Sequence, residues 1–225
     1  MISHLERYRS GERTQAWREL VAFGAAVREE PLYSDARAVA EEIMQRISFN
    51  LHLILKRLVA LEFQFTSGWS APDKRLLTEL EAIEHYGTLP LVVDCWFRNI
   101  GQISLSGFHP RLSYDEGNAD VFPDAIGPNT DPLEVAFVSF SHEDPEDHED
   151  NEPAYVCIAD GLTVPLSSSF DAPFNSYYFT GTFFIPYLQT CFDWGGFPGL
   201  RHYPEAAERA REELAFLKEG LLPLL

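Results

Sequence analysis

The residue types best suited to chemistry gather in one short segment. His142 to Glu152 holds seven acidic residues and two histidines within eleven positions. Carboxylates and imidazoles bind hard and borderline cations. The spacing argues against a metal site, because no glycine stands where an EF-hand loop turns and no HxxxH or CxxC pair is present. We expect no bound metal here. Two interpretations stay open: a solvated loop kept flexible by self-repulsion, or a protein-binding patch.

Further acids precede this segment in a stretch rich in proline and glycine. They are Asp115, Glu116, Asp120, Asp124 and Asp131. These acids could join the same face as the first group. A nuclease or glycosidase would need paired carboxylates held rigidly in a cleft, and nothing in the sequence places two of them together. We therefore predict no catalytic residue among them.

Other catalytic and cofactor motifs are absent from the sequence. No GxSxG, GxxxxGK[ST] or strand-GxGxxG element occurs, which removes the usual serine-hydrolase, P-loop and dinucleotide-binding sites. Cys95, Cys157 and Cys191 are far apart and are interpreted as small core residues in a reducing, cytoplasmic compartment. The sequence therefore predicts no cofactor and favours a protein that is not an enzyme.

The charge is strongly segregated along the chain. The protein has 35 acidic and 17 basic residues, for a net charge of −18, and Leu112 to Leu200 contains 16 acids but no lysine or arginine. A single-sign field attracts basic surfaces and repels phosphates, so we expect a basic protein partner and no nucleic acid.

No window approaches the roughly 20 apolar residues of a membrane helix. Met1 to Arg9 has no apolar signal core, so we expect no membrane partner and a cytoplasmic location.

Residues 1–62 are predicted to be helical. Apolar residues recur at steps of three and four from Val39 to Leu61, which predicts a long helix capped by Asp35. A second helix from near Thr14 is expected to pack against it as a hairpin. His52, beside the apolar stripe, is expected to be at least half-buried with a backbone partner.

Residues 63–225 mix helices with short strands. Asp73 is a predicted N-cap, Pro90 starts the next helix and Gly101 stops it. Strands are expected over 103–105, 133–140, 154–159, 162–166 and 175–180, and helices over 183–193 and 204–219. The glycine-rich turn at 195–199 is interpreted as structural. The predicted fold class is α+β: an N-terminal helical hairpin (1–62), then an antiparallel sheet bordered by helices (63–225) with an acidic insertion at about 142–152.

Two segments resemble the SUKH superfamily of bacterial immunity and interaction proteins. The first combines Leu80 to Ile83 with Gly87 to Phe97 and Gly101, which resembles the helix, leucine-proline helix start and glycine turn of that family. The second, Gly181 to Leu188, resembles its late glycine-threonine and Phe-rich helix element. The resemblance spans about residues 73–200.

The resemblance implies a compact α+β domain with a non-catalytic role, often as an immunity protein that blocks a toxin such as a nuclease. A basic toxin agrees with the charge argument, since complementary potentials raise association rate and specificity. The expected partner-binding residues are Asp115, Glu116, Asp120, Glu143, Asp144, Glu146, Asp147, Glu149 and Asp150. Two alternatives stay open: a metal-dependent hydrolase using these carboxylates with His142 or His148, and a scaffold protein that binds through its helical N-terminus.

Overall fold

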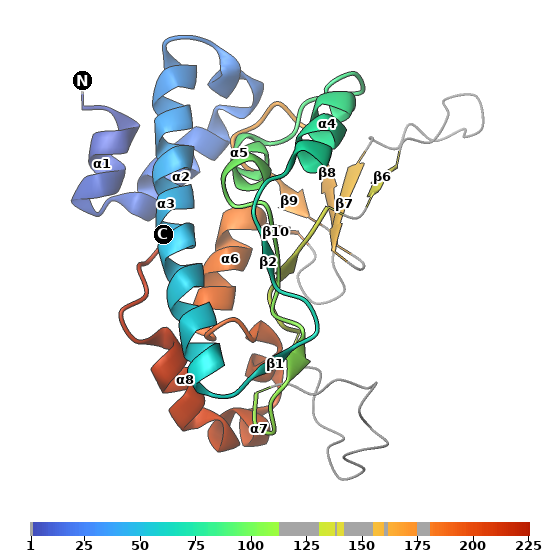
Figure 1. Ribbon diagram of the computed structural model, residues 1–225. Helices are drawn as coiled ribbons and strands as arrows, with labels where there is room; N and C mark the ends of the chain where they lie inside the picture. The colour runs from blue at the N-terminus through green and yellow to red at the C-terminus, as the bar shows by residue number, and fades with distance from the viewer. Residues whose placement is uncertain (1, 113–130, 138, 142–154, 160–161, 175–180) are drawn as a thin grey trace.

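The computed structural model describes residues 2–112, 131–137, 139–141, 155–159, 162–174 and 181–225. It confirms the α+β class, because N-terminal helices precede small antiparallel sheets (Figure 1). The first elements are α1 (His4–Ser10), α2 (Arg13–Ala22), the 3-10 helix η1 (Gly24–Arg28) and α3 (Leu32–Ala60). None of the helices within the described residues is long and apolar enough to cross a membrane.

The long helix α3 forms where the apolar stripe predicts it, but its predicted cap is wrong. α3 begins at Leu32, so Asp35 lies inside its first turn. The Asp35 carboxylate instead accepts hydrogen bonds from the backbone N–H groups of His4 (2.7 Å) and Leu5 (3.2 Å). Those first N–H groups of α1 have no partner within their own helix. Burial alone would raise the pKa of Asp35, but the hydrogen bonds from His4 and Leu5 lower it.

Two further helices follow the predicted signals closely. α4 (Lys74–Ile83) is capped by Asp73, whose Oδ1 accepts from the Leu76 N–H at 2.8 Å. α5 (Leu91–Asn99) has Pro90 at its N-cap rather than at its first helical position. It ends just before Gly101, which has a φ of +86°. The predicted cap at Asp73 and the predicted stop at Gly101 are therefore confirmed.

The strands are short and every described pairing is antiparallel. β1 (Gln64–Phe65) pairs with β4 (Gly107–Phe108), and β9 (Pro173–Phe174) with β10 (Thr182–Phe183). The two three-stranded sheets have the orders β2-β3-β5 (Trp69–Ser70, Gln102–Ser104, Glu134–Val135) and β6-β7-β8 (Ser139–Ser141, Tyr155–Ala159, Leu162–Pro165). The expected strand at 175–180 lies outside the described residues.

The single strand expected over 133–140 is wrong, because the chain changes sheets there. β5 pairs with β3, whereas β6 pairs with β7. Between them, the Ala136 N–H donates to Ile158 O (2.8 Å) and the Phe137 N–H donates to the side-chain Oε1 of Gln102 (3.1 Å). The Gln102 side chain thus accepts the hydrogen bond that, in a continuous strand, a backbone carbonyl of the neighbouring strand would accept.

The C-terminal part consists of α6 (Phe184–Asp193), the 3-10 helix η3 (Pro198–His202), α7 (Pro204–Arg209) and α8 (Arg211–Lys218). The single helix expected over 204–219 is wrong, since Ala210 leaves helical geometry with φ −94° and ψ 9°. α8 lies against α3, where Arg57 donates to Leu217 O at 3.0 Å. The turn before η3 is structural as predicted, because it places Phe197 fully in the core.

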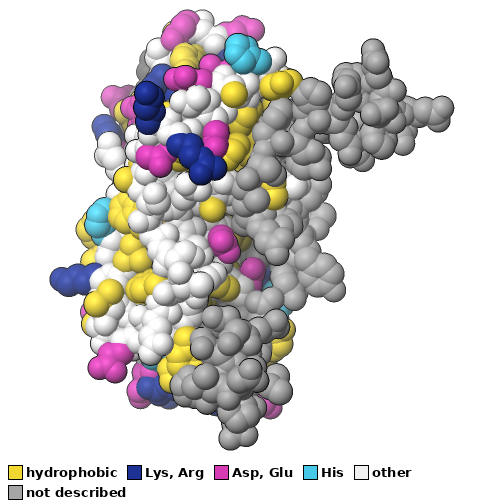
Figure 2. Space-filling model, turned by 45° about the vertical axis from the view of Figure 1, so that its right-hand side comes forward, with side chains coloured by type: hydrophobic (Ala, Val, Ile, Leu, Met, Phe, Trp, Pro, Cys, Tyr) yellow, Lys and Arg dark blue, Asp and Glu magenta, His cyan; other side chains and the backbone are white. Residues whose placement is uncertain are grey.

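The described surface mixes basic and acidic side chains (Figure 2). Many of these charges are joined in ion pairs, for example Arg9–Glu42 (2.8 Å), Arg37–Glu41 (3.0 Å) and Arg75–Glu79 (3.0 Å). All 17 basic residues belong to the described part of the chain, but only 23 of the 35 acids do. The described residues therefore carry a net charge of only −6.

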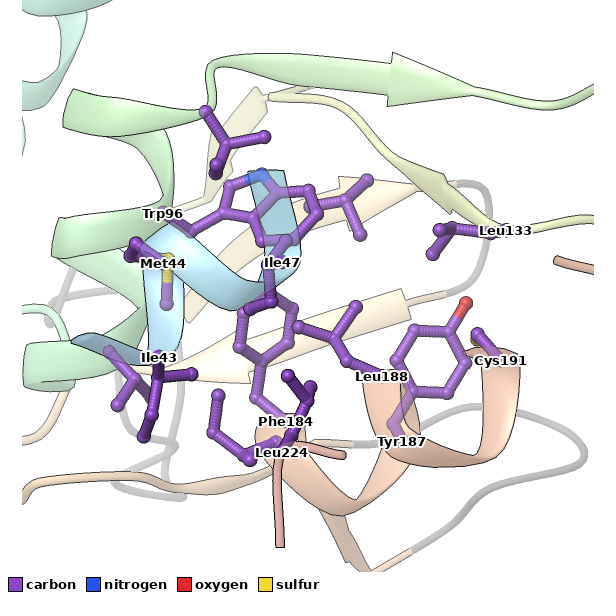
Figure 3. Packing of buried hydrophobic residues seen from close by; sticks show 14 of the residues in the cluster. Ile43, Met44, Ile47, Trp96, Leu133, Phe184, Tyr187, Leu188, Cys191 and Leu224 are labelled. Carbon is purple, nitrogen blue, oxygen red and sulfur yellow. The ribbon is translucent and has the colours of Figure 1, made fainter. Parts of the chain in front are cut away.

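One hydrophobic core joins the N-terminal helices to the rest of the chain. Its centre lies between α3, α5 and α6, where Ile43 and Ile47 lie near Trp96 and Phe184 (Figure 3). The rings of Trp96 and Phe184 meet edge to face with centroids 5.5 Å apart, a favoured aromatic geometry. Residues 1–62 and 63–225 thus bury their apolar side chains against each other.

Candidate functional site

The nine predicted partner-binding acids all lie outside the described residues: Asp115, Glu116, Asp120, Glu143, Asp144, Glu146, Asp147, Glu149 and Asp150. The structure does describe where their segments begin and end. Residues 142–154 join β6 to β7, whose ends are directly paired at Ser141 and Tyr155. This acidic segment is therefore the connection of a β-hairpin.

The other acidic segment, residues 113–130, lies between the buried residues Leu112 and Leu133, with the half-buried Asp131 and Pro132 at its end. Leu112 is fully buried, and the N–H of Leu133 donates to Gly196 O at 2.8 Å. Burial raises the pKa of Asp131, which lies at the described end of this segment. In Figure 1, β6 and β7 stand at the upper right and β1, the partner of β4, stands at the lower end near α7. The 113–130 segment thus starts beyond β4 at the lower end of the molecule. The chain that follows it reaches β7 through the hydrogen bond from the Ala136 N–H to Ile158 O, and β7 also borders the 142–154 segment.

An ion pair between an exposed arginine and a buried carboxylate lies just before the 113–130 segment. Arg111, the last basic residue before the base-free stretch, pairs with Glu213 of α8. The Glu213 side chain is only 4% exposed, and its Oε2 has no hydrogen-bond partner within the described part of the chain. Removing Arg111 would leave the buried Glu213 carboxylate without its paired charge. This pair therefore ties the start of the acidic segment to α8.

A second buried carboxylate, that of Asp171, joins two helices. It accepts hydrogen bonds from the backbone N–H groups of Ala172 (2.8 Å), Phe184 (3.1 Å) and Ile185 (3.1 Å), and from Trp17 Nε1 (3.0 Å). Burial raises its pKa to about 6, against the opposing effect of these donors. Asp171 thus links α2 to the start of α6. All its donors are structural, so we assign it no chemical step.

Two of the described cysteines are buried thiols, and one described histidine tests a prediction of burial. Burial raises the pKa of Cys95 to about 12 and raises that of Cys191 as well, which disfavours the nucleophilic thiolate. His52 is exposed, so the predicted burial is wrong. Its Nδ1 lies 2.7 Å from Ser48 O, which confirms the predicted backbone partner. Within the described ranges, no three His, Cys, Asp or Glu side chains form a group that could hold a metal ion. His142 and His148 lie outside these ranges.

Motifs in the sequence do not reveal one cluster of basic side chains. Arg28 and Arg37 line a common pocket with Arg98, which lies on a later helix. None of the three is next to another basic residue, so no basic run marks them. Comparison of the chain with protein-family models, curated protein sequences and solved structures finds no significant match.

Proposed function

We propose that this protein is a non-catalytic protein-binding module that takes a basic protein partner through its acidic segments. The observation that carries the proposal is the distribution of charge. Residues 113–130 and 142–154 contain eleven acids and no basic residue, whereas the described residues are close to balance. A concentrated negative field accelerates encounter with basic surfaces and disfavours nucleic acids.

Two features of the described residues support this function. Residues 142–154 connect two paired strands, and residues 113–130 follow the fully buried Leu112, so a well-packed body carries both acidic segments. Most arginines of that body are held in ion pairs, for example Arg7 with Glu12 (3.0 Å) and Arg98 with Asp94 (2.7 Å). Because those arginines are already paired, they compete little with a basic partner for the acids of residues 113–130 and 142–154.

The specific role that we propose is that of an immunity protein. Such a protein would block a basic toxin, for example a nuclease, by covering the surface that binds phosphates. This role rests on the resemblance to the SUKH superfamily and on the charge argument together. It requires neither a cofactor nor a metal ion.

The test is affinity capture from the source cell with three forms of the full chain. The first is the wild type. The second replaces Glu143, Asp144, Glu146, Asp147, Glu149 and Asp150 by the matching amides. The third makes the same change in charge at six exposed acids of the described body: Glu29, Glu62, Glu81, Glu205, Glu212 and Glu219.

We expect a basic protein to be retained by the wild type and the body variant and lost by the segment variant. Equal retention by all three forms, or retention of no basic protein, contradicts the proposal.

Calorimetry with Mg²⁺, Mn²⁺, Ca²⁺ and Zn²⁺ checks the hydrolase alternative. Tight binding of one ion by the wild type and not by the segment variant would favour that alternative.

A further inference from the structure

Three arginines from distant parts of the chain meet in one pocket. The pocket has a volume of about 510 Å³ and lies between η1, the start of α3, α4 and α5. These elements stand at the upper end of the molecule in Figure 1. The charged residues in its wall are Arg28, Arg37, Arg98, Glu84 and Asp94. In a protein of net charge −18, a wall with more cations than anions is unexpected.

Arg28 is held in place by groups that carry no full charge. Its Nη2 donates to Leu89 O at 2.5 Å, and its Nε donates to Ser168 O at 3.4 Å. The guanidinium carbon lies 5.9 Å from the centre of the Tyr33 ring. Carbonyl oxygens and an aromatic face fix the side chain without neutralising it. Arg28 therefore presents a pre-organised positive charge.

The other two arginines contact acids but use only part of their donors. Arg98 donates from Nε to Asp94 (2.7 Å) and from Nη2 to Glu84 (2.9 Å). Arg37 donates from Nε to Glu41 at 3.0 Å in an exposed pair one helical turn apart. A guanidinium has five N–H donors. An exposed pair of this kind contributes little to stability, so Arg37 can turn toward a ligand at little cost.

The remaining wall of the pocket suits the body of an organic molecule. Leu80, Ile83 and Leu89 are at most 6% exposed and form the floor of the pocket. The surface open to a ligand is mainly polar, and Tyr33 and Thr88 add a ring and hydroxyl groups to it. Ligand pockets commonly have volumes of about 300–1,000 Å³ and combine apolar surface with a few placed polar groups. Arginine recognises carboxylates and phosphates with paired hydrogen bonds.

We propose that this pocket binds a small organic anion through a carboxylate or phosphate group. Arg28 and Arg37 bind the anionic group, and the exposed parts of Tyr33 and Thr88 contact the rest of the molecule. Arg98 is neutralised by Glu84 and Asp94, which also keep a second anionic group out of that side of the pocket. The binding is independent of the acidic segments and of any protein partner.

Isothermal titration calorimetry of the full chain tests the site with three probes: adenosine monophosphate, citrate and inorganic phosphate. We expect one-to-one binding of at least one organic anion, and binding of that anion at least about 10-fold tighter than of inorganic phosphate. Arg37→Gln is expected to weaken the affinity about 10-fold, since a charge-assisted hydrogen bond contributes about 1.5–3 kcal/mol. Binding of adenosine monophosphate alone would identify the phosphate group, and binding of citrate alone the carboxylate.

The matched control is Arg75→Gln, which breaks the similar exposed pair Arg75–Glu79 on α4, away from the pocket. This variant should bind like the wild type. Arg28→Lys serves as a second variant. It keeps the positive charge but loses the planar guanidinium, which can donate two parallel hydrogen bonds to a carboxylate or phosphate. The proposal is overturned if neither organic probe binds, if inorganic phosphate binds as tightly, or if Arg75→Gln weakens binding as much as Arg37→Gln does.

Discussion

Asn50 and Leu222, 172 residues apart, exchange two hydrogen bonds as two paired strand residues would. The Asn50 Nδ2 donates to Leu222 O at 2.9 Å, and the Leu222 N–H donates to Asn50 Oδ1 at 2.7 Å. Asn50 is fully buried on α3. Nearby, the Tyr8 hydroxyl donates to Leu224 O at 2.6 Å. Polar side chains of the N-terminal helices thus hold the last residues of the chain.

Asn50→Ala is expected to lower the free energy of unfolding by about 2 kcal/mol. The variant loses both hydrogen bonds and leaves the N–H and C=O of Leu222 without these partners. Urea unfolding measures this loss as a lower midpoint at unchanged slope. The control is Asn99→Ala, whose exposed side chain donates to Cys95 O within its own helix, and this change should cost about 0.5 kcal/mol. Equal losses in both variants would contradict the special role of Asn50.

Asp171 should give stability a pH dependence of its own. Its folded pKa of about 6 lies above the ordinary 3.8, so the folded state holds this proton more tightly than the unfolded state does. The contribution is complete below about pH 3.8 and is lost as the pH rises through about 6. It amounts to about 3 kcal/mol, since one pKa unit corresponds to about 1.36 kcal/mol.

The measurement compares unfolding free energies of the wild type and Asp171→Asn from pH 4 to pH 7. The wild-type value minus the variant value should fall across this window, because the amide does not titrate. Parallel curves for the two proteins would show that Asp171 has no raised pKa.

Gly101→Ala should be strongly destabilising. Gly101 has a φ of +86°, and an added Cβ would overlap the backbone of Ser70 and lie 2.8 Å from Pro72 N. Backbone atoms cannot move aside as a side-chain end can, so we expect a loss of about 3 kcal/mol or more. Gly220→Ala is the control: its φ is +67° with nothing within 4 Å, so only about 1 kcal/mol of strain is expected. Thermal unfolding of both variants separates the cost of atomic overlap at Gly101 from the cost of backbone strain alone at Gly220.

Cys95 and Cys191 should resist alkylation in the native protein. Both are buried, and burial raises the pKa of Cys95 to about 12, so little thiolate exists at pH 8. Iodoacetamide labelling followed by peptide mapping should find both modified only after denaturation. Rapid native labelling of either residue would indicate an accessible thiolate and would reopen the question of a catalytic cysteine.

Local signals predicted the elements whose stabilising contacts are themselves local. Asp73 caps α4 three residues away, and the stripe from Val39 to Leu61 forms one face of α3. Asp35 carried the same type of signal but serves α1 instead, because its partners come from tertiary packing. The hydrogen bond from Phe137 to the Gln102 side chain, which splits the strand, likewise depends on a contact 35 residues away.

The candidate sites show the same limit. The acidic segments are visible in the sequence because their charges are contiguous, whereas Arg28, Arg37 and Arg98 come together only through the packing of η1, α3, α4 and α5. Asp171 did leave a weak signal: it is a single acid between Phe170 and Ala172 in a base-free, apolar region. Such an acid can be suspected of burial, but its four donors cannot be identified without the fold.

The most direct test of the proposed function is the salt dependence of affinity for the basic protein that the wild type captures. We expect the affinity of the wild type to fall at least about 10-fold between about 50 and 500 mM NaCl, because salt screens exposed charges. The variant with six amides in residues 143–150 should bind weakly at low salt and show a clearly smaller salt dependence. The same affinity and the same salt dependence in both proteins would contradict a function carried by the acidic segments.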